Sequence, residues 1–335
     1  MKHLESVLRH SPKGGSRIGW SSISQFAECE WSWFLSNVVP HPKGGFGVSQ
    51  GDARPLWVGA MFHSAMQAWF LSAPETAQYS LDAALAGLEE AIRADGLRER
   101  DGDKAAEWES EVSQLFRRYA LECGPQGPDP DGDRFRVAFD AEGPLVERDF
   151  EIDLGYQGYY YTSRIDLVAW DAVTKGQLLV VEHKTCDVSR AGSALRGYAL
   201  DPQLSGETLA VAAAWQRPVV PVINMVKKRA AAKSTCRAWE PMPRSQHDLE
   251  KFRIDVVRRL KRMDERVEEY KSLVDKGVPA LDAGSLVFDG SPKGKICADQ
   301  GRQCAFYSAC YQRSTREHWL AATEPRFQLE EGTLA

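Results

Sequence analysis

The segment LLVVEHKTC, residues 178–186, places charged side chains at the end of an apolar run. Its leading apolar residues predict a buried β-strand, and Glu182, His183 and Lys184 follow directly. Burying an unpaired charge costs on the order of several kcal/mol, so compensating groups must lie nearby. Because alternate residues share a strand face, we expect Glu182 and Lys184 to point together and His183 to point away.

A second acid, Asp166 in SRIDLVAW, lies on the preceding predicted strand. If the two strands pair, Asp166 and Glu182 converge, and two close carboxylates repel each other unless a cation lies between them. Mg²⁺ or Mn²⁺ would accept such oxygen ligands and lower the pKa of a bound water, which Lys184 could orient. A purely structural ion pair explains Glu182 and Lys184 equally well.

Three further side chains could reach the same end of the sheet. His63 lies on a predicted helix, away from the middle of its apolar stripe, and imidazole suits Mn²⁺. Gln203, four residues before Glu207, lies at the start of the helix that follows the charged strand. Glu147 lies on the first predicted strand and could add negative charge. These residues strengthen the expectation of a metal site.

The periodicity of the chain changes at GPQGPDPDGDR, residues 124–134, a loop rich in helix- and strand-breaking residues. Before it, helices are predicted near residues 26–35, 56–71, 77–95 and 104–122. After it, strands are predicted at 145–154, 156–170, 177–185 and 218–228, with helices at 202–215 and 245–276. This order of elements predicts an α/β core.

We therefore divide the chain into five parts. They are an N-terminal tail (1–17), a helical N-terminal part (18–134), an α/β core (135–245), a long amphipathic helix (246–284) and a cysteine-containing C-terminal region and tail (285–335).

The composition of the 335 residues, 43% hydrophobic and 27% charged, is typical of a soluble globular protein. No apolar run approaches the roughly 20 residues that cross a bilayer, and the N-terminal segment lacks the apolar stretch of a signal peptide. We expect a cytoplasmic protein that does not bind a membrane. The net charge of −5 does not indicate a nucleic-acid binder, but Lys227, Lys228 and Arg229 form a basic cluster. A solvated surface is the simplest interpretation of that cluster.

The succession GAMFHSAMQAWF, SRIDLVAW, LLVVEHKT and DPQLSGETLA resembles the PD-(D/E)XK nuclease superfamily, specifically its RecB-like branch. The resemblance covers residues 18–310 and implies a restriction-endonuclease-like core, with a central mixed β-sheet flanked by helices. It departs from the family pattern at Ile165, where the name of the family has Pro, and at Glu207, where a Tyr is frequent.

The resemblance also implies roles for individual residues. The implied metal ligands for Mg²⁺ or Mn²⁺ are His63, Asp166, Glu182 and the backbone carbonyl of His183. The implied catalytic residues are Asp166, Glu182, Lys184 and Gln203, of which Lys184 is the catalytic lysine.

Three of the seven cysteines, Cys297, Cys304 and Cys310, crowd the C-terminal region, and Cys29 stands near the start of the chain. Thiolates select Zn²⁺ or iron–sulfur clusters, and the spacing does not choose between these two. The chain lacks the C-x2-C pairs of a zinc ribbon. A subset of RecB-like nucleases, including AddB-type and CRISPR-associated adaptation nucleases, carries a [4Fe–4S] cluster on one early and three late cysteines. The resemblance therefore implies such a cluster here, with Zn²⁺ as the alternative, although the gap of six residues between Cys297 and Cys304 departs from the usual two.

Together the site residues and the resemblance predict a metal-dependent deoxyribonuclease. The resemblance further implies an exonuclease in DNA recombination, repair or phage DNA processing. It also implies single-stranded DNA or DNA with free ends as the substrate, and a helicase or recombination protein as a partner. Basic residues that could hold the strand are Arg164, Lys227, Lys228 and Arg229. The alternative is a module of the same fold that binds DNA or a helicase without catalysis. A zinc hydrolase built on the C-terminal cysteines is disfavoured because no H-E-x-x-H pattern is present.

Overall fold

The computed structural model describes residues 19–48, 54–156, 158–174, 176–187, 191–228, 237–290, 304, 306, 309–310, 316–323 and 325–327. The chain forms two compact units. Unit 1 comprises Met1–Gly51, Asp153–Tyr161 and Arg253–Ala335, and unit 2 comprises Asp52–Ile152 and Thr162–Phe252. The linear division expected from the sequence stays a prediction. None of the helices in the described residues is both long enough and apolar enough to span a membrane.

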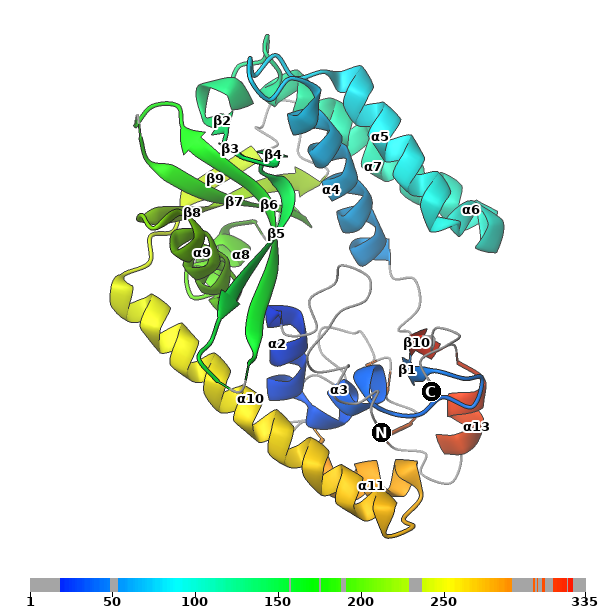
Figure 1. The fold of residues 1–335 in the computed structure, drawn as a ribbon. Coiled ribbons are helices and arrows are strands. Elements are labelled where there is room, and N and C mark those ends of the chain that lie inside the picture. The colour runs from blue at the N-terminus through cyan, green and yellow to red at the C-terminus, as the bar shows by residue number, and fades with distance from the viewer. Residues whose placement is uncertain are drawn as a thin grey trace. The chain divides into compact units, whose positions relative to one another are not determined.

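A mixed β-sheet forms the centre of unit 2 (Figure 1). Its strands are β2 (Phe135–Val137), β5 (Val146–Asp153), β6 (Tyr160–Asp171), β7 (Leu178–Asp187), β8 (Val219–Lys228) and β9 (Arg237–Pro241). The order is β2-β6-β7-β8-β9, and β5 pairs with β6 away from this path. β7 and β8 are parallel, whereas the β2–β6, β6–β7 and β8–β9 pairs are antiparallel. A short pair, β3 (Phe139–Asp140) and β4 (Gly143–Pro144), lies outside this sheet.

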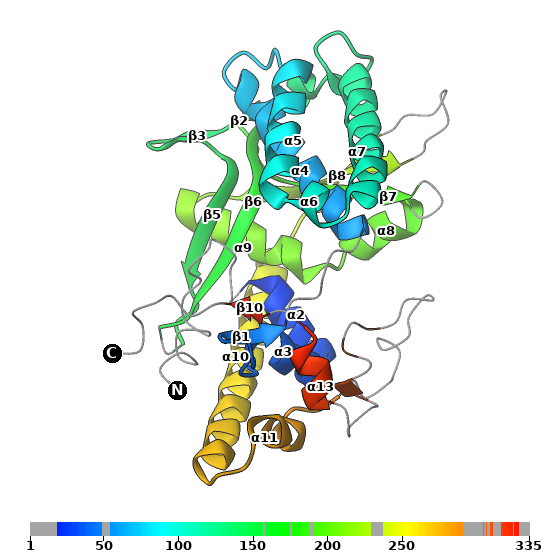
Figure 2. The same ribbon diagram turned by 90° about the vertical axis from the view of Figure 1, so that its right-hand side faces the viewer.

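Helices cover both faces of this sheet. The first group is α4 (Arg54–Ser72), α5 (Leu81–Asp95), α6 (Leu97–Arg100) and α7 (Gly102–Cys123), followed by the 3-10 turn η1 (Asp131–Asp133). The second group, α8 (Ala191–Tyr198) and α9 (Pro202–Trp215), lies in the crossover that a parallel β7–β8 pair requires. Figure 2 shows α5 and α7 beside α4. The predicted α/β class, with a central mixed sheet flanked by helices, is confirmed.

The alternation of side chains along β7 separates the two cores. Leu179 and Val181 pack in the apolar cluster that α4, α5 and α7 form with the sheet. Leu178 and Val180 pack in a second cluster that contains Val211 of α9. This alternation places the next residues of the strand on the same two faces, so Glu182 and Lys184 follow the α9 face and His183 follows the α4 face.

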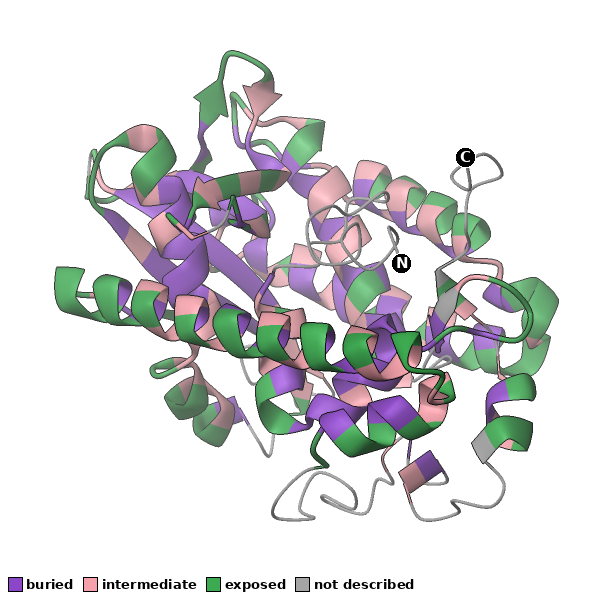
Figure 3. Ribbon diagram, turned by 60° about the horizontal axis from the view of Figure 1, so that its bottom comes forward, coloured by how far each residue is buried: buried purple, intermediate pink, exposed green. Residues whose placement is uncertain are grey.

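Unit 1 contains the remaining elements. They are α2 (Trp20–Glu28), α3 (Glu30–Asn37), β1 (Phe46–Val48), most of α10 (Gln246–Asp275), α11 (Ala280–Val287), α13 (Arg316–Ala321) and β10 (Pro325–Phe327), which pairs with β1. The single helix predicted over 26–35 is wrong, because extended backbone at Cys29 separates α2 from α3. The predicted amphipathicity of α10 is confirmed: one flank carries buried Val256, Leu260 and Val267, and the other is exposed (Figure 3).

Two helical glycines near the site make a matched pair of substitutions. In Gly87→Ala on α5, the new Cβ would clash with the Cβ of Ala68 on α4, whereas the same change at Gly59 of α4 meets nothing within 4 Å. We expect Gly87→Ala to lower the free energy of unfolding by about 1–3 kcal/mol through overpacking. Gly59→Ala should raise it by about 0.5–1 kcal/mol through helix propensity. Chemical denaturation measures both, and equal effects of the two changes would contradict the close approach of α4 and α5.

Candidate metal and catalytic site

The site lies where the β6–β7 ladder ends. Leu167 pairs with Val181 in the antiparallel register, so the next residues along the two strands are Asp166 and Glu182. There the backbone N–H of His183 donates to Asp166 Oδ2 at 2.7 Å. The structure therefore brings Asp166 and Glu182 together at one end of the sheet, with both side chains buried.

Three side chains from three elements form a group of potential metal ligands. His63 Nδ1 of α4 lies 3.2 Å from Asp166 Oδ1 of β6 and 3.6 Å from Glu147 Oε1 of β5. One ligand atom from each residue lies within 4.8 Å of the others. One imidazole and two carboxylates are donors that suit Mg²⁺ or Mn²⁺, so these residues fit the ion that the sequence led us to expect.

Glu147 is the member of this group that sequence reasoning underrated. Its backbone has φ of 50°, in the left-handed region that non-glycine residues seldom adopt. Such conformations are uncommon away from sites where the surrounding structure enforces them. Negative charge on the first strand was the only signal in the sequence, and the backbone conformation that accompanies its contact with His63 has no sequence signature.

Glu182 and Lys184 form an ion pair that α9 supports. Lys184 Nζ donates to Glu182 Oε1, which also accepts from Gln203 Nε2 at 2.9 Å. The same Gln203 nitrogen donates to Glu207 Oε1 at 2.7 Å, one helical turn along α9. Gln203 thus reaches the charged end of β7. Glu182 lies outside the group of ligand atoms around His63, so its role as a ligand stays a prediction.

Burial and mutual repulsion set the protonation of these acids. Burial and the neighbouring Asp166 charge raise the pKa of Glu182 to about 7, although Lys184 acts in the opposite direction. Burial also raises the pKa of Asp166, but the facing His63 more than reverses this, so that pKa lies below its ordinary value. Burial lowers the pKa of His63, but Asp166 and Glu147 raise it well above its ordinary value. The raised pKa favours a protonated His63, which then faces Asp166 and Glu147 as a cation.

His183 contributes its ring to the opposite face of β7. The imidazole stacks on Phe70 of α4 with ring centroids 5.6 Å apart, and Nδ1 lies 3.0 Å from Asn224 Nδ2. Burial lowers the pKa of His183 to about 3, so the ring is neutral. Any contribution of His183 to a metal site would come from its backbone carbonyl, and that role stays a prediction.

Two of the basic residues expected to hold DNA, Arg164 and Lys228, have acidic neighbours. Arg164 donates to both carboxylate oxygens of Asp149, at 3.0 and 3.1 Å. Lys228 Nζ lies 3.8 Å from Glu111 Oε1. Lys227 lies at the end of β8, and Arg229 lies outside the described residues. A role of these residues in binding DNA stays a prediction.

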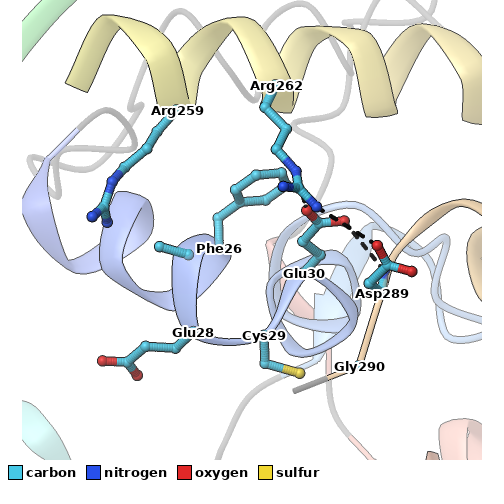
Figure 4. A pocket seen from close by; sticks show the side chains of 9 residues that line it. Phe26, Glu28, Cys29, Glu30, Arg259, Arg262, Asp289 and Gly290 are labelled. Carbon is cyan, nitrogen blue, oxygen red and sulfur yellow. Dashed lines mark hydrogen bonds and ion pairs between the residues drawn. The ribbon is translucent and has the colours of Figure 1, made fainter. Parts of the chain in front are cut away.

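The cysteines expected to hold a cluster belong to unit 1. Cys29 is buried, its sulfur accepts from the N–H of Ser32, and it lines a pocket of about 570 Å³ with Arg259 and Arg262 (Figure 4). Cys304 and Cys310 are of intermediate exposure. Cys297 lies outside the described residues.

Comparison with known proteins gives one extensive match. The model of the family described as the PD-(D/E)XK nuclease superfamily matches residues 17–311. A search of curated proteins found no match. Among solved structures, one titled "Crystal structure of SSO0001" is similar, with 12% identity over 49% of this chain and 69% of that chain. The TM-score of 0.26 is too low for that likeness to carry an argument.

Binding of Mn²⁺ should strengthen as pH rises from 6 to 8. An ion at this site would displace the proton of His63, whose pKa is raised, and, with Glu182 as the predicted further ligand, also the proton of Glu182, whose pKa is about 7. Each displaced proton makes the affinity up to about tenfold higher per pH unit while the group is still protonated. Isothermal titration calorimetry at both pH values measures the Kd, and Glu147→Gln should weaken binding at each. A Kd that is the same at pH 6 and pH 8 would contradict the proton competition.

Proposed function

Because this chain belongs to the PD-(D/E)XK nuclease superfamily, we propose that it is a metal-dependent deoxyribonuclease that hydrolyses phosphodiester bonds of DNA. The observation that carries the proposal is that two clusters of polar side chains lie together at one end of the sheet. One cluster offers metal ligands from His63, Glu147 and Asp166, and the other pairs Glu182 with Lys184. A structural ion pair alone would not need the first cluster.

The residues that would hold Mg²⁺ or Mn²⁺ are His63, Glu147, Asp166, Glu182 and the backbone carbonyl of His183. When bound, the ion would lower the pKa of a water molecule and stabilise negative charge on the phosphate. Asp166 is held in place by its contacts with His63 and with the N–H of His183. These contacts keep its carboxylate ionised and fixed before any ion arrives.

Lys184 would act as a permanent positive charge. Burial lowers its pKa, but the charges of Glu182 and Asp166 raise the pKa above its ordinary value, so the ammonium group keeps its proton. A charged lysine cannot act as a general base. It can offset phosphate charge and orient the attacking water by donating hydrogen bonds. Gln203 holds Glu182 in place beside it.

We further propose membership of the RecB-like branch. The order of His63, Asp166, Glu182-x-Lys184 and Gln203 along the chain supports this branch. By the same resemblance the enzyme would be a cytoplasmic exonuclease on single-stranded DNA or DNA ends. It would act in recombination, repair or phage DNA processing beside a helicase or recombination protein. A non-catalytic module of the same fold is the alternative.

We also propose a [4Fe–4S] cluster on Cys29, Cys297, Cys304 and Cys310, with Zn²⁺ as the alternative. The donor chemistry fits, because cysteine sulfurs are the ligands that iron–sulfur clusters and Zn²⁺ accept in proteins. Backbone N–H groups also point at two of the sulfurs, from Ser32 to Cys29 and from Phe306 to Cys304. Hydrogen bonds of this kind stabilise cluster thiolates. Such a cluster would join early and late segments of the chain and would add stability rather than hydrolytic chemistry.

Replacing Lys184 tests the catalytic proposal. With Mn²⁺ and an end-labelled single strand, we expect Lys184→Ala to lower kcat by about 10²-fold or more, because a positioned charge at the developing anion is lost. The matched control Lys104→Ala removes an exposed lysine of α7 and should leave kcat unchanged. Linear and circular strands compared in the same assay test the need for a free end. Absence of cleavage by the wild type, or equal rates after Lys184→Ala, would favour the non-catalytic module.

Optical absorption and metal analysis test the cluster. Protein purified without oxygen should absorb visible light and contain about four iron atoms per chain. Cys29→Ala should abolish both, whereas the control Cys186→Ser should keep them. A colourless protein that contains about one zinc ion per chain would support the alternative instead.

A further inference from the structure

A buried chain of polar side chains leads from the loop at residues 124–134 to β7. At its far end, Asp131 of η1 is completely buried, an unusual position for an acid in a loop of breaker residues. Its carboxylate accepts from Trp69 Nε1 at 3.0 Å, from the Tyr119 hydroxyl at 2.8 Å and from an Arg237 nitrogen at 2.6 Å. These charge-assisted contacts compensate for the burial of the acid.

The direction of the hydrogen bonds in this chain is fixed by the acid. Because the Tyr119 hydroxyl donates to Asp131, its oxygen is left to accept from Asn224 Nδ2 at 3.0 Å. The second amide hydrogen of Asn224 then points at His183 Nδ1, also at 3.0 Å. Nδ1 of His183 is therefore the acceptor nitrogen, and the proton of the neutral ring lies on Nε2.

The chain ends on the residue between the two charged residues of the proposed site. His183 is fixed on one side by the Asn224 amide and by the stacked ring of Phe70. It is fixed on the other side by the bond from its N–H to Asp166. Its peptide also sets the directions in which Glu182 and Lys184 leave the strand. The same chain includes Trp69, which lies on α4 with His63.

We propose that Asn224, backed by Tyr119 and Asp131, is a positioning residue that fixes the His183 peptide and thereby the metal-binding carbonyl and the Glu182–Lys184 pair. This inference rests on the proposed nuclease function. Stability alone gives a weak reason for the chain, since apolar side chains of similar volume commonly replace buried polar networks without loss. Removal of a group that orients a metal ligand typically lowers metal affinity or activity by about 10–100-fold.

The test compares three variants in unit 2. Asn224→Leu removes both amide donors at similar volume, and Tyr119→Phe removes only the hydroxyl behind them. Val112→Ala is the matched control, because it disturbs the core of α7 two turns from Tyr119 without touching the polar chain. For Asn224→Leu we expect the Kd for Mn²⁺, measured by calorimetry without DNA, to rise about tenfold or more. In the same variant kcat should fall by a similar factor while KM for DNA stays nearly constant, and Tyr119→Phe should show the same pattern more weakly.

Three results would overturn the positioning role. The first is an Asn224→Leu variant that keeps the wild-type Kd and kcat. The second is a Val112→Ala variant that loses as much Mn²⁺ affinity as Asn224→Leu at a similar drop in Tm. The third is a proton on Nδ1 of His183, measured by ¹⁵N NMR of the histidines in the wild-type protein. This measurement does not depend on the folding of any variant.

Failure of the proposed function looks different. A wild-type protein that binds no Mn²⁺ and cleaves no DNA would remove the nuclease proposal, and the positioning role with it. If the wild type binds Mn²⁺ and cleaves DNA, and Asn224→Leu keeps the same Kd and kcat, only the positioning role is removed.

Discussion

Several acids meet at one end of the central sheet, and the structure tolerates them because cationic groups face two of them. Asp166 is opposed by His63, and Glu182 is opposed by Lys184. Without those partners, carboxylates this deeply buried would hold their protons or would repel one another. A proton on His63 thus supplies one of the two positive charges that a divalent ion would bring to these acids. A divalent ion bound between His63, Glu147 and Asp166 would displace that proton and would leave one more positive charge facing the acids.

The alternation of side chains between the two faces of β7 explains most of what the sequence could predict about the site. The apolar run of β7 marks a buried strand, and its period of two assigns Glu182 and Lys184 to one face and His183 to the other. The structure agrees with this assignment. Glu182 contacts Lys184 and also Gln203 of α9, whereas His183 stacks on Phe70 of α4. The bounds predicted for the helix at residues 202–215 match α9, where Asp201 caps the first turn and Pro202 begins it. Local signals were sufficient here because packing and capping agree with the pattern.

Features that depend on distant parts of the chain could not be predicted in this way. The left-handed backbone at Glu147 accompanies a contact with His63 on another element. The loop at residues 124–134 was interpreted only as punctuation, yet Asp131 within it is buried because Trp69, Tyr119 and Arg237 donate to it. None of those partners is close in sequence to the acid. The break between α2 and α3 at Cys29 is likewise invisible to an apolar periodicity that continues across it.

The departure at Glu207 from the pattern of the proposed RecB-like branch has a consequence for the charge of the site. Glu207 is completely buried, and burial together with the nearby Glu182 charge raises its pKa well above the ordinary value. One of its oxygens accepts from Gln203, and the other has no hydrogen-bond partner among the residues that the structure describes. An ionised carboxylate with a buried, unbonded oxygen would cost more than a neutral acid. Burial and the neighbouring Glu182 charge therefore favour the protonated form of Glu207, which adds no negative charge beside Glu182. Its acid group supports Gln203 while the charge on that face stays with Glu182 and Lys184. In this way a carboxyl group can stand where a tyrosine is frequent without upsetting the balance of charge on which the site depends.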